Sequence, residues 1–219
     1  KSNGTTVDGV EPLVTRTTTQ TVSVKGFDQF GKVMSSLPSI TWTTTSAPTG
    51  GSASTRLSSG IATATFTRAG TYGIKGVAGG LVVTFQVNVE ATLSRVSVRN
   101  ADNREVSSGG TISFSGSRYQ LGAIGLDQFG QPLTSQPEVT WQTVSAVTGG
   151  TATLTATGNS VSAEVNKAVA YSLRATSGTL LSNVTLSVAQ VLTSFRLATS
   201  SGNAVDPAVA VPVTTTSSL

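Results

Sequence analysis

A segment of about 75 residues occurs twice in this chain of 219 residues, and the second copy follows the first at a constant offset of 99 positions. The pentapeptide Phe27-Asp28-Gln29-Phe30-Gly31 returns as Leu126-Asp127-Gln128-Phe129-Gly130. The same offset relates Ile40-Thr41-Trp42 to Val139-Thr140-Trp141. Matches this frequent, without a gap, indicate a duplicated structural unit rather than one large fold.

The repeat also predicts the domain boundaries. Residues 1–90 form a unit that lacks its first strand, residues 91–190 form a complete unit, and residues 191–219 open a third. The first strand of the complete unit is expected at 93–98, and its counterpart in the third unit is 192–197. Two interpretations remain open: residues 191–219 begin another repeat of a longer array, or they are a strand that one chain donates to the next.

Within each unit, apolar and polar residues alternate with a period of two. Val83, Phe85, Val87 and Val89 occupy every second position of one run, as in a half-buried strand. Thr and Val favour strands over helices, and turn residues recur every 8–12 positions. Further strands are expected at 22–26, 39–44, 118–126, 139–144, 152–157, 160–165 and 171–175. About seven strands per unit predict an all-β chain of tandem immunoglobulin-like antiparallel β-sandwiches.

Trp42 and Trp141 lie on the third expected strand of their units, where an immunoglobulin-like sandwich commonly buries a Trp. Ile40 and Val139, two residues earlier, point to the same face of the strand. A structural role in the core is therefore the prediction. The alternative is an exposed platform on which a sugar ring stacks.

Asp28 and Asp127 open the turn that both units share. An Asp at this position accepts a hydrogen bond from its own backbone two residues on, and Gly31 and Gly130 then take the positive φ. We predict a structural role for these four residues.

Two further aromatic pairs occupy equivalent positions in the two units. Phe30 and Phe129 lie inside the polar turns, and their rings either fold over the end of their own core or contact a neighbouring unit or partner. Tyr72 and Tyr171 are expected to be structural residues of the next-to-last strand.

Composition excludes several kinds of chemistry. The chain has no His and no Cys, so it cannot supply a Ser–His–Asp triad, a Cys–His pair, a thiolate zinc site or a disulfide. Glu138 and Glu164 have no acidic counterparts in the first unit, which favours solvated charges over the paired acids of a glycosidase. We predict no catalytic residue and no cofactor.

Calcium between the units is the one metal alternative. Ca²⁺ takes about six to eight oxygen ligands, several of them carboxylates. The acidic residues that could supply them near the linker are Glu90, Asp102, Glu105 and Asp127. This set is sparse and lacks a recognised acidic motif, so the prediction is no metal site.

Charge and hydropathy exclude two classes of partner. The densest basic stretch is Arg95, Arg99 and Arg104, interleaved with acidic residues, which is typical of a solvated strand edge rather than a nucleic-acid surface. No run of 18 apolar residues occurs, so no membrane span is expected in this segment.

The order of these motifs resembles the bacterial immunoglobulin-like repeats that occur in tandem in surface and secreted proteins, including adhesins of the intimin and invasin kind. The residues that carry the resemblance in the first unit are Asp28–Gly31, Ile40–Trp42 and Ala69–Ile74, and in the second unit 127–132, 139–141 and Ala168–Leu173. The resemblance implies the sandwich fold and a bacterial extracellular or cell-surface location. It transfers no catalytic motif.

The leading functional hypothesis is a non-catalytic structural and adhesive module that forms an extended rod. Its partners would be neighbouring repeats or identical chains, and a host or matrix glycan or protein. One alternative is a carbohydrate-binding accessory module of a larger extracellular enzyme. Another is a fibre subunit that polymerises by strand exchange through residues 191–219.

Overall fold

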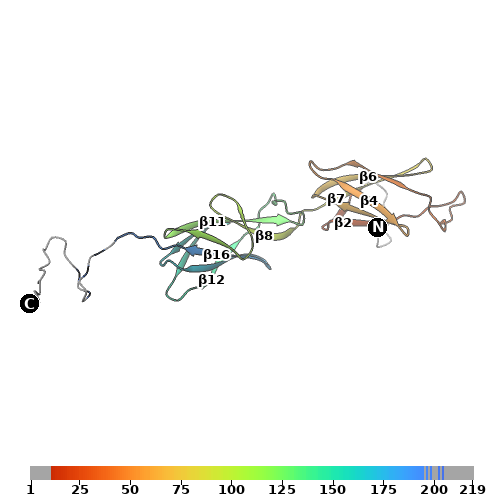
Figure 1. Cartoon of the computed structure of the whole chain (residues 1–219). Helices are drawn as coiled ribbons and strands as arrows, with labels where there is room; N and C mark the ends of the chain where they lie inside the picture. Colours follow the sequence, from red (N-terminus) through yellow and green to blue (C-terminus); the bar gives the residue numbers. More distant parts are fainter. Residues whose placement is uncertain (1–10, 195, 197, 199–201, 203, 205–219) are drawn as a thin grey trace, which may run out of the picture.

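The computed structural model describes residues 11–194 together with 196, 198, 202 and 204. Within these residues every regular element is a β-strand, and the strands build two sandwiches that lie end to end (Figure 1). The strands of the first sandwich are β1 (Leu13–Thr15), β2 (Thr19–Ser23), β3 (Thr41–Ser46), β4 (Ala53–Ser58), β5 (Ile61–Phe66), β6 (Gly70–Ala78) and β7 (Leu81–Val89). Those of the second are β8 (Leu93–Arg99), β9 (Glu105–Val106), β10 (Gly110–Phe114), β11 (Arg118–Asp127), β12 (Thr140–Ala146), β13 (Ala152–Thr157), β14 (Ser160–Val165), β15 (Ala170–Ser177) and β16 (Leu180–Val188).

Each sandwich packs two sheets whose strand order is that of an immunoglobulin-like domain. The first sandwich has sheets β1-β7-β6-β3 and β2-β5-β4, and the second has β10-β16-β15-β12 and β13-β14-β11-β8-β9. A short strand, β1 or β10, pairs in parallel with the last strand of its sandwich, β7 or β16. The other pairs among the named strands are antiparallel.

The two sandwiches differ in the sheet that contains β2 or β11. β11 pairs with β14 on one side and with β8 on the other, and β8 in turn pairs with β9. Within the described residues β2 pairs with β5 alone, so β2 is an edge strand. The sequence predicts a missing first strand at this edge, although residues 1–10 lie outside the described part of the chain.

The alternating pattern buries one face of each sheet. In β5, Ala62, Ala64 and Phe66 are buried whereas Ile61 and Thr65 are exposed, and β14 repeats this pattern of burial. The first core is formed by Leu13, Val22, Ala62, Ala64, Phe66, Tyr72, Ile74, Phe85, Val87 and Val89. The second core is formed by Val96, Val98, Leu121, Ala123, Val139, Val161, Ala163, Val165, Tyr171, Leu173, Ala175, Val184, Leu186 and Val188. Each sandwich therefore closes a core of its own.

A buried tyrosine fixes the same corner in both sandwiches. The Tyr72 hydroxyl donates to the Arg68 carbonyl at 2.8 Å, and the Tyr171 hydroxyl donates to the Lys167 carbonyl at 2.9 Å. Both rings are fully buried. A tyrosine that bonds the backbone a few residues upstream in this way is a hallmark of immunoglobulin-like sandwiches.

The predicted all-β fold of immunoglobulin-like sandwiches is confirmed, while two details of the prediction are wrong. The run expected at 22–26 is strand Thr19–Ser23, because polar Thr19 and Gln20 pair with β5 although they break the apolar alternation. The second sandwich has nine strands rather than about seven, because turns divide residues 93–114 into β8, β9 and β10.

Candidate functional site

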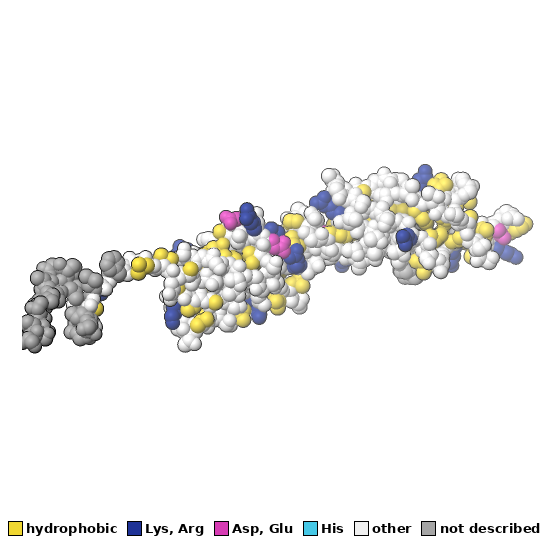
Figure 2. Space-filling view, in the orientation of Figure 1, with side chains coloured by type: hydrophobic (Ala, Val, Ile, Leu, Met, Phe, Trp, Pro, Cys, Tyr) yellow, Lys and Arg dark blue, Asp and Glu magenta, His cyan; other side chains and the backbone are white. Residues whose placement is uncertain are grey.

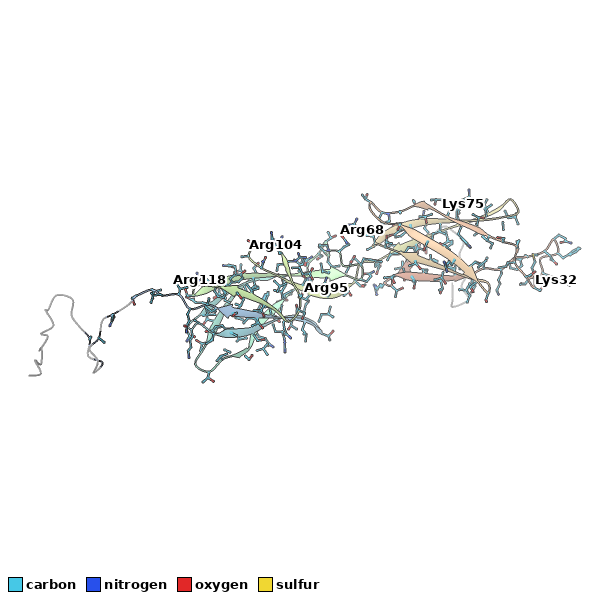
Figure 3. All side chains as sticks on the ribbon, viewed as in Figure 1. Lys32, Arg68, Lys75, Arg95, Arg104 and Arg118 are labelled. Atoms are coloured by element: carbon cyan, nitrogen blue, oxygen red, sulfur yellow. The ribbon has the colours of Figure 1, made fainter. Side chains whose placement is uncertain are left out.

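Polar and apolar side chains from both sandwiches meet at the junction between them. Residues 90–92 join β7 to β8, and the turn after β11, residues 127–131, lies beside them. In Figure 3, Arg68 lies at the junction end of the first sandwich, and Lys32 lies at the opposite, outer end. The junction is therefore built from one end of each sandwich.

The shared Asp turns have equal geometry in both sandwiches. Asp127 Oδ1 accepts hydrogen bonds from the backbone N–H groups of Phe129 at 2.9 Å and Gln131 at 2.8 Å. Asp28 Oδ1 accepts the equivalent pair from residues 30 and 32 at 2.9 and 2.8 Å. Gly31 and Gly130 both have φ of 75°, which an L side chain rarely adopts. Each carboxylate thus holds its turn rigid and aims the two residues between Asp and Gly outward.

Gln128 ties the second sandwich to the linker. Its Nε2 donates to the Glu90 carbonyl at 2.8 Å, and its Oε1 accepts from the Thr92 backbone N–H at 2.9 Å. The Thr92 hydroxyl lies 3.2 Å from the same Oε1. One amide side chain therefore satisfies backbone groups on both sides of Ala91, which limits rotation of the linker.

Phe129 and Gln131 reach onto the first sandwich itself. Half-buried Phe129 packs against the first core, and Gln131 Oε1 accepts from Arg68 Nη2 at 3.0 Å. Arg68 is positioned by a second bond, from Nη1 to the Thr49 carbonyl at 2.8 Å. For Phe129, contact with the neighbouring unit is the interpretation that the structure favours.

The equivalent turn of the first sandwich has no unit against it within the described residues. Phe30 is 78% exposed, so the interpretation that this ring folds over its own core is wrong. Phe27, Val33 and Met34 are also exposed on the same loop. Figure 2 shows hydrophobic and charged side chains together at this outer tip.

The two tryptophans are half-buried and pack against the cores. Trp42 stacks edge-on against Phe85 with ring centroids 6.1 Å apart, and Trp141 packs against the second core. Trp141 Nε1 donates to the Asn159 carbonyl at 3.4 Å, whereas Trp42 Nε1 is buried without a partner. Neither ring forms the open platform that a sugar would need.

The acidic residues considered for calcium are engaged separately. Within the described residues no group of three acidic side chains is close enough to hold a metal ion. Glu90 pairs with Arg16 at 2.7 Å, Glu105 pairs with Arg95, and Asp127 holds its turn. Asp102 is exposed in the turn after β8. The calcium alternative therefore gains no support.

Glu105 forms an ion pair with Arg95 on the neighbouring strand. Its hydrogen bond to the Arg95 guanidinium lowers the pKa of Glu105 below the usual range. Partial burial acts in the opposite direction, and the positive charges of Arg95 and Arg99 add to the lowering. This ion pair joins β8 to β9, which is typical of a structural role.

Sequence reasoning assigned no role to Gln128, Gln131 or Arg68. A signal for Gln128 was present, because the turn geometry requires only the Asp and the Gly, yet both units also share the Gln and Phe between them. An identity that local geometry does not require points to a contact outside the turn. No helix long and apolar enough to span a membrane occurs in the described residues.

No protein-family model matches the chain, and no curated protein matches it in sequence. Among solved structures, it is similar to the D00-D0 domain of intimin, with 12% identity, a TM-score of 0.44, and coverage of 84% of this chain and 98% of that one. It is similar to domains 4 and 5 of the S-layer protein SbsC, with 18% identity, a TM-score of 0.33, and coverage of 76% and 80%. It is also similar to the A168-169 segment of titin, with 15% identity, a TM-score of 0.35, and coverage of 82% and 95%. Similarities this loose establish no family and no function for this chain.

Proposed function

We propose that this chain is a non-catalytic structural and adhesive module, two sandwiches held end to end as a stiff rod on a bacterial surface or in a secreted protein. The observation that carries the proposal is the junction. Gln128 bonds the linker on both sides of Ala91, Phe129 packs on the first core, and Arg68 bonds Gln131. Such a joint extends the molecule along one axis and fixes the direction of the second sandwich relative to the first.

The composition supports the same function. Thr and Ser together account for 66 of 219 residues, whereas Asp and Glu account for 10. A hydroxyl-rich surface keeps exposed strands hydrated without depending on pH or salt, which suits a protein that holds its shape outside the cell. The bacterial surface location rests on the sequence resemblance to tandem immunoglobulin-like repeats.

The carbohydrate-binding alternative has less support. It needs flat aromatic rings that are open to solvent, and Trp42 and Trp141 are half-buried against their cores. Strand exchange through 191–219 concerns residues that lie mostly outside the described part of the chain. Of this segment, residues 191–194, 196, 198, 202 and 204 are described; they belong to no named strand, and Ala198 and Ala204 pair through an isolated bridge.

Small-angle X-ray scattering of the full chain tests the rod. A nine-residue strand such as β7 spans about 30 Å, so end-to-end sandwiches joined by a three-residue linker have centres roughly 40 Å apart. The pair-distance distribution should therefore show a second maximum near about 40 Å. A single maximum, as from sandwiches packed side by side, would contradict the proposal.

A further inference from the structure

The second sandwich carries an open hollow at the end that faces away from the first. The hollow has a volume of about 570 Å³ and lies between the loop after β14 and the residues that follow β16. Its lining includes Val165, Lys167, Val188, Val191 and Leu192. Leu192 is 81% exposed and Val191 is 59% exposed, so apolar surface faces solvent at its rim.

This hollow occupies the position at which the first sandwich receives the turn of the second. The turn bonds three residues of the first sandwich and the linker that follows it: Arg68, Glu90 and Thr92. At the offset of 99 they correspond to Lys167, Ala189 and Val191, and all three line the hollow. Two residues of the first core at this end, Phe66 and Val89, correspond to Val165 and Val188, which also line it.

Lys167 makes the same backbone contact as Arg68. Lys167 Nζ donates to the Thr148 carbonyl at 3.3 Å, as Arg68 donates to the equivalent carbonyl of Thr49 at 2.8 Å. A positively charged side chain is therefore held at this end of each sandwich. At the occupied end it also bonds the amide oxygen of Gln131.

The turn at the outer end of the first sandwich, residues 28–32, does not match the charge at the edge of this hollow. That turn presents Phe30 as the second presents Phe129, but Lys32 stands where the second turn has Gln131. If the outer tip of one chain docked in the hollow of another, Lys32 would approach Lys167. Like charges facing each other across an interface oppose association, whereas an amide oxygen or a carboxylate accepts from the ammonium group.

We propose that the hollow is a docking site for the Asp-Gln-Phe-Gly turn of a further sandwich of this kind, one with a hydrogen-bond acceptor at the position of Gln131. The same chemistry excludes the chain's own Phe30 turn, so Lys32 and Lys167 keep identical chains from joining head to tail. The inference rests on the proposed function, because it extends the rod by repeating its internal joint. It names the partner surface and the residue that selects it.

The test changes one exposed residue, Lys32, so that the turn of the first sandwich has the same sequence as the turn of the second. K32Q gives the first turn the Asp-Gln-Phe-Gly-Gln sequence of the second, which removes the facing charge and supplies an acceptor. The full-length wild-type chain should sediment as a monomer up to about 1 mM, because docking of its own turn would place Lys32 against Lys167. K32Q should self-associate about tenfold or more tightly than the wild type, as expected when a like-charge contact is replaced by a hydrogen bond.

Two controls identify the joint. In the K32Q background, Phe30→Ala should abolish association, because the exposed ring is the apolar anchor. Lys167→Glu alone should promote association, because Lys32 then faces a carboxylate. Methyl signals of Val165 and Val188 should shift when K32Q chains associate.

Three results would overturn the inference. K32Q could remain monomeric at about 1 mM, the wild type could associate as tightly as K32Q, or the Phe30→Ala change could leave association intact. Equal association of wild type and K32Q would mean that a second copy's own Phe30 turn occupies the hollow. Failure of the rod itself is read separately, from a scattering curve that lacks the second maximum.

Discussion

Replacing the corner tyrosines by phenylalanine should destabilise each sandwich by an amount set by the hydrogen bonds that the hydroxyl makes. Tyr72 loses one bond, and the Arg68 carbonyl is left without this partner, which should lower the free energy of unfolding by about 1.5 kcal/mol. Tyr171 both donates to the Lys167 carbonyl and accepts from the Lys167 N–H at 3.2 Å. Removal of the Tyr171 hydroxyl should therefore lower the free energy of unfolding by more, about 2 to 3 kcal/mol.

The assay follows each sandwich by its own tryptophan. In a Trp42→Phe background, the fluorescence of Trp141 reports guanidinium unfolding of the second sandwich, and Trp141→Phe isolates the first. The midpoint should fall while the denaturant slope stays constant, because the folded contacts are otherwise retained. In thermal melts, a loss of 1.5 kcal/mol corresponds to roughly 6 to 12 °C for a sandwich of this size.

Tyr119→Phe is the matched control. Tyr119 is a half-buried ring outside the corner, and its centroid lies 4.9 Å from that of Phe114. Removal of the Tyr119 hydroxyl should lower the free energy of unfolding by less than about 0.5 kcal/mol. If Tyr171→Phe cost no more than this control, the reasoning that the corner bond stabilises the sandwich would be refuted.

Two further predictions concern packing and pH. At Gly76 an added Cβ would lie 2.8 Å from the Trp42 ring, so Gly76→Ala should destabilise the first sandwich by about 1 to 3 kcal/mol, measured by the same unfolding assay; unchanged stability would show that the ring can shift freely. Because the folded pKa of Glu105 is lowered, the Arg95 pair stabilises the fold above the usual carboxyl pKa and is lost as pH falls through the folded value. Comparison of Glu105→Gln with wild type should show a difference of about 0.5 kcal/mol or less at pH 7 that shrinks as the pH falls below the usual carboxyl pKa, and a difference that grew in acid would contradict this.

Local features of this fold could be predicted from the sequence, because neighbouring residues determine them. The Asp–Gly turn depends on a carboxylate that bonds backbone groups two and four residues on and on a glycine at positive φ, so its geometry follows from Asp127 and Gly130 alone. Strands 152–157 and 160–165 follow from alternation on either side of a short turn. The repeat then extends each inference to the other unit.

The junction could not be predicted from either unit alone. Arg68 and Gln131 are 63 positions apart and meet only because the end of one sandwich faces the start of the next. Whether Phe129 covers its own core or the preceding one depends on that arrangement, and the sequence left both interpretations open. The two-residue strand β9 is likewise defined by pairing with β8 rather than by any pattern of its own.

The most direct test of the central claim, that the two sandwiches form one stiff rod, is a spin-label distance between equivalent exposed positions. Because the chain has no cysteine, Ser54→Cys and Thr153→Cys, on β4 and β13, can be labelled without removing native thiols. Double electron–electron resonance should give one narrow distribution near about 40 Å, the length of one repeat. Adding Gln128→Ala and Phe129→Ala should broaden it. A wild-type distribution already as broad as that of the junction variant would contradict the account.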